Sequence, residues 1–173
     1  MSRSTRVFVA AGSNVDPVEN LRLAARELSR CFSEVRFSAA YRNAAVGFEG
    51  DDFINYVAGF STDAAVEAVV AELQRIEGLC GREREAPKWA PRSMDLDILL
   101  YGDLICDRPS LVLPRPDLLR RPYMLGPMAE LAPEVIHPLE KLSMGDLWKN
   151  FDPAAHPMQR VDLGLESLAA SDA

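Results

Sequence analysis

Two carboxylates stand two positions apart inside an apolar run that suits a buried strand. Asp95 and Asp97 lie in MDLDILLY, residues 94–101. Alternate residues of a strand share a face, which places both acids on one side with their Cβ atoms roughly 7 Å apart, followed there by Leu99 and Tyr101. The opposite face carries the apolar residues Met94, Leu96, Ile98 and Leu100. Two carboxylates at this spacing can converge on one or two divalent cations, as in two-metal sites.

A cationic loop, GREREAPKWAPR at 81–92, immediately precedes the two acids. Cations beside a di-acid site are what a magnesium–polyphosphate ligand requires, because the metal neutralises some oxygens and guanidinium groups bind others. Trp89 in such a loop is expected to cover a ligand. Two plainer interpretations stay open: the acids lie at the solvent edge of a strand, or Glu83 and Glu85 make 81–92 a solvated, charge-paired loop.

Other features exclude several classes of protein. The net charge of -7 argues against a general binder of nucleic acid or anionic membranes. No Gly-x-x-x-x-Gly-Lys-Ser/Thr occurs, so the chain is not a P-loop protein. Its three dispersed cysteines indicate reduced thiols in the cytoplasm, and its apolar N-terminal run is too short for a signal peptide or membrane span. His137 and His156 both precede proline without an acid or cysteine nearby, and we assign them no catalytic role.

The elements that must position these residues follow from periodicity. Strands are predicted at 6–11, 34–41, 53–62 and 94–101. One helix is predicted after a cap at Asp16, and a second after a cap at Thr62 or Asp63, ending near Gly78. The order βαββαβ predicts an α+β, ferredoxin-like core with helices on one face of an antiparallel sheet.

C-terminal additions follow this core. They are short extended pieces at 104–113, a helix near 124–131 and a short helix near 143–149. The length of 173 residues suits one domain with a sizeable core, which we place at 1–151. Residues 152–173 are rich in Pro, Ala, Ser and Asp and are expected to form a flexible tail.

The stretch KWAPRSMDLDILL closely resembles the signature of the 6-hydroxymethyl-7,8-dihydropterin pyrophosphokinase family. The positions that fit are Lys88, Ala90, Pro91, Arg92, Asp95, Leu96, Asp97, Ile98 and Leu99. The resemblance runs from about residue 5 to 150. It implies a ferredoxin-like fold and transfer of an intact pyrophosphoryl group from MgATP to the hydroxymethyl oxygen of the pterin, with release of AMP, in folate biosynthesis.

The same resemblance implies roles for individual residues on the phosphate side. Asp95 and Asp97 should ligate two magnesium ions and act in catalysis together with Arg82 and Arg92, which should contact the phosphates. Contacts to the nucleotide are implied for Gln74, Glu77, Arg84, Trp89, Ile98, Arg115 and Arg121. Arg84 and Trp89 should belong to a loop that closes over the ligands.

The pterin is a flat, polar heterocycle that requires stacking and hydrogen bonds at its edge. The resemblance implies that Phe53 and Tyr123 sandwich it and that Asn55 bonds its amide edge. Backbone groups near Ala44, Ala45 and Val46 should complete that edge. Phe53 could instead pack in the core, but by period two it shares a strand face with Asn55, which favours the pocket.

The chain departs from the family pattern near the pterin loop and at one phosphate position. It has NAAVG at 43–47 where prolines are common, and Arg115 where a histidine is usual. Two other hypotheses stay open: a non-catalytic binding module on the same fold, and a different metal-dependent phosphotransferase or nucleotide hydrolase. As partners we expect only small molecules, ATP and the pterin, with no nucleic acid or membrane, and we expect a monomer.

Overall fold

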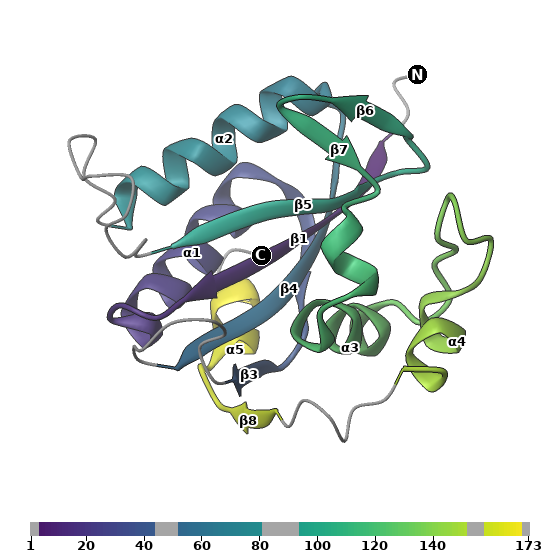
Figure 1. Ribbon diagram of the computed structural model, residues 1–173. Coiled ribbons are helices and arrows are strands. Elements are labelled where there is room, and N and C mark those ends of the chain that lie inside the picture. Colours follow the sequence, from purple (N-terminus) through teal and green to yellow (C-terminus); the bar gives the residue numbers. More distant parts are fainter. Residues whose placement is uncertain (1–3, 44–51, 81–93, 152–157, 171–173) are drawn as a thin grey trace.

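A six-stranded antiparallel sheet is the centre of the computed structural model (Figure 1). The structure describes residues 4–43, 52–80, 94–151 and 158–170. In chain order the elements are β1 (Thr5–Ser13), α1 (Pro17–Cys31), β2 (Ser33–Phe37), β3 (Ala40–Asn43), β4 (Phe53–Thr62), α2 (Val66–Leu79), β5 (Asp95–Tyr101), β6 (Cys106–Arg108), β7 (Leu111–Leu113), the 3₁₀ helix η1 (Pro116–Leu119), α3 (Pro122–Leu131), α4 (Met144–Lys149), β8 (Gln159–Val161) and α5 (Leu165–Ala170). The protein therefore combines helices with an antiparallel sheet, as predicted.

The strands of the sheet follow the order β5-β1-β4-β3-β8, and β2 also pairs with β4. The central pair, β1 and β4, is in register along the whole of β1. The stretch 34–41, predicted as one strand, is divided into β2 and β3. Ser38 lies at the division, where its backbone N–H donates to the carbonyl of Val57 and its hydroxyl accepts from the Val57 N–H, both at 2.9 Å.

Helices lie on both faces of the sheet (Figure 1), and an apolar cluster packs beneath them on each face. On one face, Val7 and Val9 of β1 pack with residues of α1, α2 and α5. On the other, Phe8 and Ala10 pack with residues of η1, α3 and α4. The two helices of the predicted core, α1 and α2, share one face, and the C-terminal elements η1, α3 and α4 cover the other. An uninterrupted apolar strand is buried on both sides, and α3 supplies the second cover.

A β-bulge interrupts the pairing of β1 with β5. Consecutive residues of β1 lie opposite Leu100 and Ile98, which leaves Leu99 as an extra residue on β5. Up to Ile98 the apolar residues face α1 and α2, as predicted, but Leu100 joins Leu99 on the α3 face and Tyr101 packs on the α1–α2 face. The predicted sides of Leu100 and Tyr101 are wrong because a strict alternation does not reveal an inserted residue.

The starts of both long helices differ from the predicted caps. Asp16 precedes α1 but has a left-handed backbone (φ 42°) and makes no capping hydrogen bond with its side chain. Helix α2 begins later than predicted, after Ala65. The hydroxyl of Thr62 accepts from the Ala64 N–H at 3.1 Å, so it stabilises the turn before the helix rather than the helix itself.

The C-terminal segment is folded against the domain in its described part. Strand β8 pairs with β3, and Leu163 and Leu165 are 4% and 6% exposed in the same core as α1 and α2. Arg22 of α1 also donates a hydrogen bond to the carbonyl of Leu163. The expected flexible tail from 152 is therefore wrong for 158–170. Although the segment is mostly polar in composition, its residues Leu163 and Leu165 pack in the core.

The cysteines are free; Cys80 and Cys106 are buried and Cys31 is exposed. His137 is also buried, and its Nδ1 accepts backbone hydrogen bonds from Leu139 and Glu140 at 3.2 and 3.1 Å, which gives it a structural role. In the part of the chain that the structure describes, no helix has the length and apolar character needed to cross a membrane.

The docked C-terminal helix leads to a stability prediction. Leu165→Ala should lower the free energy of unfolding by about 2 kcal/mol or more, because it leaves a cavity in the core. Leu139→Ala, at a leucine that is 58% exposed, is the matched control and should change it by less than about 0.5 kcal/mol. Urea unfolding followed by circular dichroism measures both. Equal midpoints for the two variants would show that α5 contributes nothing to the core.

Candidate functional site

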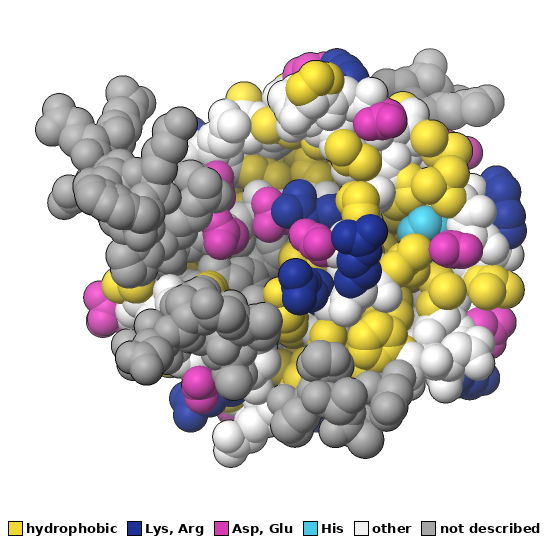
Figure 2. All heavy atoms as spheres, in the orientation of Figure 1, with side chains coloured by type: hydrophobic (Ala, Val, Ile, Leu, Met, Phe, Trp, Pro, Cys, Tyr) yellow, Lys and Arg dark blue, Asp and Glu magenta, His cyan; other side chains and the backbone are white. Residues whose placement is uncertain are grey.

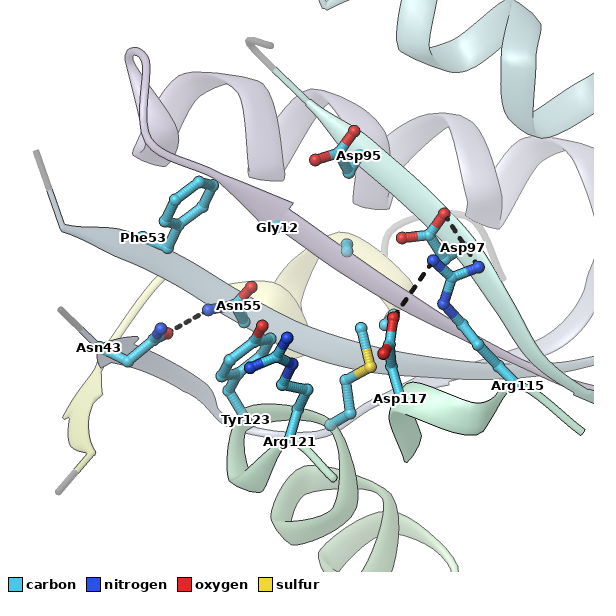
Figure 3. Close-up of a pocket in the computed structure, with 13 residues that line it drawn as sticks. Gly12, Asn43, Phe53, Asn55, Asp95, Asp97, Arg115, Asp117, Arg121 and Tyr123 are labelled. Carbon is cyan, nitrogen blue, oxygen red and sulfur yellow. Dashed lines mark hydrogen bonds and ion pairs between the residues drawn. The ribbon is translucent and has the colours of Figure 1, made fainter. Parts of the chain in front are cut away.

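A pocket of about 280 Å³ opens where the end of β1 meets the starts of β4 and β5, beside η1 and α3 (Figure 3). Figure 2 shows acidic and basic side chains gathered around a hollow on this face. Seven residues singled out in the sequence line the pocket: Phe53, Asn55, Asp95, Asp97, Arg115, Arg121 and Tyr123. Phe53 and Asp95, 42 positions apart in the chain, thus line one pocket because the sheet puts β4 and β5 on either side of β1.

The two carboxylates of β5 point into this pocket from the same face of the strand, as the alternation predicts (Figure 3). They lie opposite small residues of β1, with Asp95 beside Gly12 and Asp97 beside Ala10. Small residues on the neighbouring strand leave space over the sheet, so the acids border a cavity rather than a packed layer. The predicted di-acid arrangement is therefore present, on the face that α3 only partly covers.

Arg115 lies between two carboxylates. Its Nη1 is 3.6 Å from Oδ1 of Asp97, and its Nη2 is 3.5 Å from Oδ2 of Asp117. Figure 3 shows the guanidinium reaching from the start of η1 toward both acids. The sequence interpretation missed Asp117, although its position two residues after Arg115 in PRPD was a signal that both belong to one turn.

The amide of Asn55 occupies the floor of the pocket and is only 6% exposed. Its Nδ2 donates a hydrogen bond to Oδ1 of Asn43 on β3 (Figure 3). A Cβ atom at Gly12 would stand 2.4 Å from Oδ1 of Asn55. Gly12 is therefore needed to make room for this side chain, and Asn43 orients it. Asn43 was not identified from the sequence, because its register partner on β4 is Phe53 and its side-chain hydrogen bond to Asn55 follows only from that register.

Phe53, Tyr123 and Arg121 complete the lining from β4 and α3. Arg121 is the residue that precedes α3, where its backbone carbonyl accepts from Met124 and Leu125. Burial raises the pKa of the Tyr123 hydroxyl above its usual value, so at neutral pH this residue is an uncharged phenol. The pocket thus joins a region of rings and amides to a region of charges.

Three residues expected at the nucleotide are not among those that line this pocket. Glu77 is 7% exposed, and its Oε2 accepts from the Leu96 N–H at 3.1 Å, so it ties α2 to β5. Gln74, one turn earlier on α2, is exposed and does not line the pocket. The side chain of Ile98 packs in the core on the opposite face of the sheet. The core-facing side chain of Ile98 agrees with the alternation along the strand, whereas the buried position of Glu77 depends on how α2 packs against β5.

Several predicted residues lie outside the described residues. They are the pterin-loop residues Ala44, Ala45 and Val46, and the loop residues Arg82, Arg84, Trp89 and Arg92. The lid predicted at 81–92 also lies outside the described residues.

The acids of the pocket fit a hard divalent cation. In the described residues no group of three or more histidine, cysteine or acidic side chains could enclose a metal by itself. Asp95 and Asp97 form an open pair of oxygen donors instead. This donor set suits magnesium, which takes one or two carboxylates and completes its shell with phosphate oxygens and water.

Comparisons with known proteins agree on one family. The model of the 7,8-dihydro-6-hydroxymethylpterin-pyrophosphokinase (HPPK) family matches residues 8–133. Two proteins named 2-amino-4-hydroxy-6-hydroxymethyldihydropteridine pyrophosphokinase are similar: one from Haemophilus influenzae is 33% identical over 159 residues, 90% of this chain and 97% of that protein. The other, from Aquifex aeolicus, is 32% identical over 149 residues, 85% and 90% of the two chains.

A similar fold occurs in a solved structure. The crystal structure of wild-type Plasmodium falciparum HPPK-DHPS with pteroate matches with a TM-score of 0.69 at 11% identity, and the match covers 86% of this chain. This chain spans 42% of that larger one.

The close approach of Gly12 and Asn55 leads to a prediction. Gly12→Ala should force the Asn55 amide out of its position, because the two atoms cannot lie 2.4 Å apart. The side-chain amide resonances of Asn55 should shift in NMR spectra, and ligands that use this amide should bind more weakly. Gly78→Ala, where a new Cβ meets no atom within 4 Å, is the matched control and should leave these resonances unchanged. Unshifted Asn55 signals in Gly12→Ala would contradict the steric argument.

Proposed function

The chain belongs to the HPPK family, and from this premise we propose that its pocket transfers pyrophosphate from ATP to the hydroxymethyl group of 6-hydroxymethyl-7,8-dihydropterin, releasing AMP, as a step of folate biosynthesis. One observation carries the proposal: a single pocket holds the acid pair Asp95 and Asp97 next to the ring and amide groups of Phe53, Asn55 and Tyr123. The acid pair suits the metal ions that accompany a polyphosphate substrate, and the ring and amide groups suit a flat heterocycle.

Asp95 and Asp97 would hold magnesium, and we propose two ions, as expected for two carboxylates about 7 Å apart at Cβ. Magnesium bound there supplies neutralisation of the phosphate charge and lowers the pKa of the attacking hydroxyl. The acids contribute their fixed orientation on β5, which Glu77 stabilises through the backbone of Leu96. The enzyme is therefore proposed to be magnesium-dependent.

The cations of the pocket would bind the phosphates. Arg115 and Arg121 approach it from the two ends of the η1 turn, and arginine forks match phosphate oxygens well. Arg82, Arg84, Trp89 and Arg92 remain proposed for the nucleotide through the family resemblance. Gln74, Glu77 and Ile98 are proposed to act only indirectly, since Glu77 supports β5 and the Ile98 side chain faces the other layer.

The rings and amides would bind the pterin. Phe53 and Tyr123 supply aromatic faces, and the buried Asn55 supplies a donor and an acceptor that Asn43 orients. Ala44, Ala45 and Val46 remain proposed for the edge of the ring. The hydroxyl oxygen would attack the β-phosphorus of ATP, whose bond to the oxygen shared with the α-phosphate breaks. Holding the two substrates in line supplies much of the rate.

We infer further that the fold is ferredoxin-like, with β2 and β3 together in the place of one strand, and that α3, α4, β8 and α5 are additions to it. The proposed domain, placed at 1–151 from the sequence, extends to include 158–170, since β8 and α5 pack on it. A monomer in the cytoplasm fits the free cysteines and small-molecule substrates.

A direct assay of both products tests the proposed reaction. Protein mixed with MgATP and 6-hydroxymethyl-7,8-dihydropterin should form AMP and pterin pyrophosphate in equal amounts, measured by ion-exchange chromatography. No AMP should form without the pterin or when EDTA removes magnesium. Release of ADP or phosphate without the pterin would indicate a hydrolase instead, and binding of both substrates without turnover would indicate a non-catalytic module.

Removal of a metal ligand is the second test. Asp97→Ala should lower kcat about a hundredfold or more, since bound metal contributes several kcal/mol to transition-state stabilisation. The thermal midpoint should change little, because Asp97 lines a cavity rather than the core. Asp107→Ala, at an exposed position on β6, is the matched control and should keep full activity. Near-normal turnover by Asp97→Ala would rule out the metal role.

A further inference from the structure

Arg115 bridges acids from two elements that are otherwise separate. Asp97 belongs to β5 and Asp117 to η1, and the guanidinium reaches both at 3.6 and 3.5 Å (Figure 3). One positive charge therefore stands between two negative ones. The partner on β5 is also one of the two carboxylates proposed to hold magnesium, and the atom involved is its Oδ1.

Charge rather than hydrogen bonding holds the guanidinium in this position. Both distances exceed the range of about 2.7–3.2 Å that is usual for hydrogen bonds between nitrogen and oxygen. Its Nε is buried and has no hydrogen-bond partner among the described residues. The backbone, in contrast, is fixed, because the Arg115 N–H donates to the Leu99 carbonyl at 3.0 Å. Arg115 thus has a fixed base and a head group with unused hydrogen-bonding capacity.

We propose that Arg115 is an exchangeable counter-cation: it neutralises Asp97 and Asp117 when no divalent cation is bound, and it releases Asp97 when a cation binds there. The inference rests on the proposed function, since it takes Asp97 as a metal ligand. Asp117 keeps the released guanidinium inside the pocket, next to the space where phosphates would lie. Asp117 is then a positioning residue for Arg115.

This arrangement couples metal binding to nucleotide binding. Without nucleotide, a divalent cation must displace the Arg115 guanidinium from Asp97, and the guanidinium gains no phosphate partner in return. The affinity of the pocket for the cation alone is therefore lowered. A triphosphate offers that guanidinium two well-placed oxygens, which strengthens each interaction by forming charge-assisted hydrogen bonds. The pocket should therefore take up metal and nucleotide together more readily than metal alone.

Binding of Mn²⁺ alone, followed by the EPR signal of the free ion, tests the competition directly. Arg115→Gln should bind Mn²⁺ about fivefold more tightly than the unmodified protein in the absence of nucleotide, as expected for loss of a partly exposed charge pair. Arg121→Gln is the matched control, since it removes an arginine of the same pocket that, among the described residues, makes no ion pair with Asp97. This control should raise the affinity for Mn²⁺ by less than about twofold. Equal affinities for Arg115→Gln and the unmodified protein, or equal gains in the two variants, would overturn the proposal.

A second measurement uses the unmodified protein. The Nε–H resonance of Arg115, assigned by its absence in Arg115→Gln, should move when Mg²⁺ alone is added, and it should not respond to Mg²⁺ in Asp97→Asn. A resonance that stays in place at saturating Mg²⁺ would overturn the exchange. The AMP assay separates the two hypotheses: AMP formation without any effect of Arg115 on Mn²⁺ refutes the exchange alone. An Arg115 effect without AMP formation leaves the exchange standing and refutes the proposed reaction.

Discussion

The pairing of β1 with β4 positions nearly everything else in the molecule. These two strands are in register from one end to the other, and each is buried between helical layers on both faces. Because β5 lies beside β1 and β3 lies beside β4, the termini of these four strands meet at one end of the sheet. At this end β1 carries only small residues, Ala10, Ala11 and Gly12. A large side chain there would fill the pocket, so the same stretch that pairs the strands also leaves the cavity.

The layers on the two faces have different consequences. The α1–α2 face is closed by apolar side chains, and Glu77 joins it to β5 by a hydrogen bond at 3.1 Å. On the other face, α3 packs against only part of the sheet. The uncovered part is where Asp95 and Asp97 point, so the acids avoid the cost of burial without partners. The fold therefore separates a layer that stabilises the strand from a face that is left for ligands.

The charged side chains that line the pocket and the net charge of the whole chain lead to different expectations about binding. The net charge of -7 opposes binding of large polyanions, yet the described lining includes Arg115 and Arg121 beside three acids. The three acids and two arginines in this lining offer groups for both cations and anions in one pocket. Arg115, held between Asp97 and Asp117, reduces the repulsion between these two carboxylates. Local pairing, rather than total charge, thus determines what this site can bind.

Local patterns of the sequence were sufficient for the strand β4 at 53–62 and for the shared face of Asp95 and Asp97, whereas the family resemblance was needed to name the other predicted pocket residues. Period-two alternation and a dense motif depend on neighbours in the chain, so they can be interpreted without a fold. Tertiary structure alone decided the bulge at Leu99, the cover of the second face by α3, and the docking of 158–170. It also decided the contacts of Asn43, Glu77 and Asp117, because each depends on a partner at a distance set by strand register or helix packing. Such partners have no period in the sequence, and only packing brings them together.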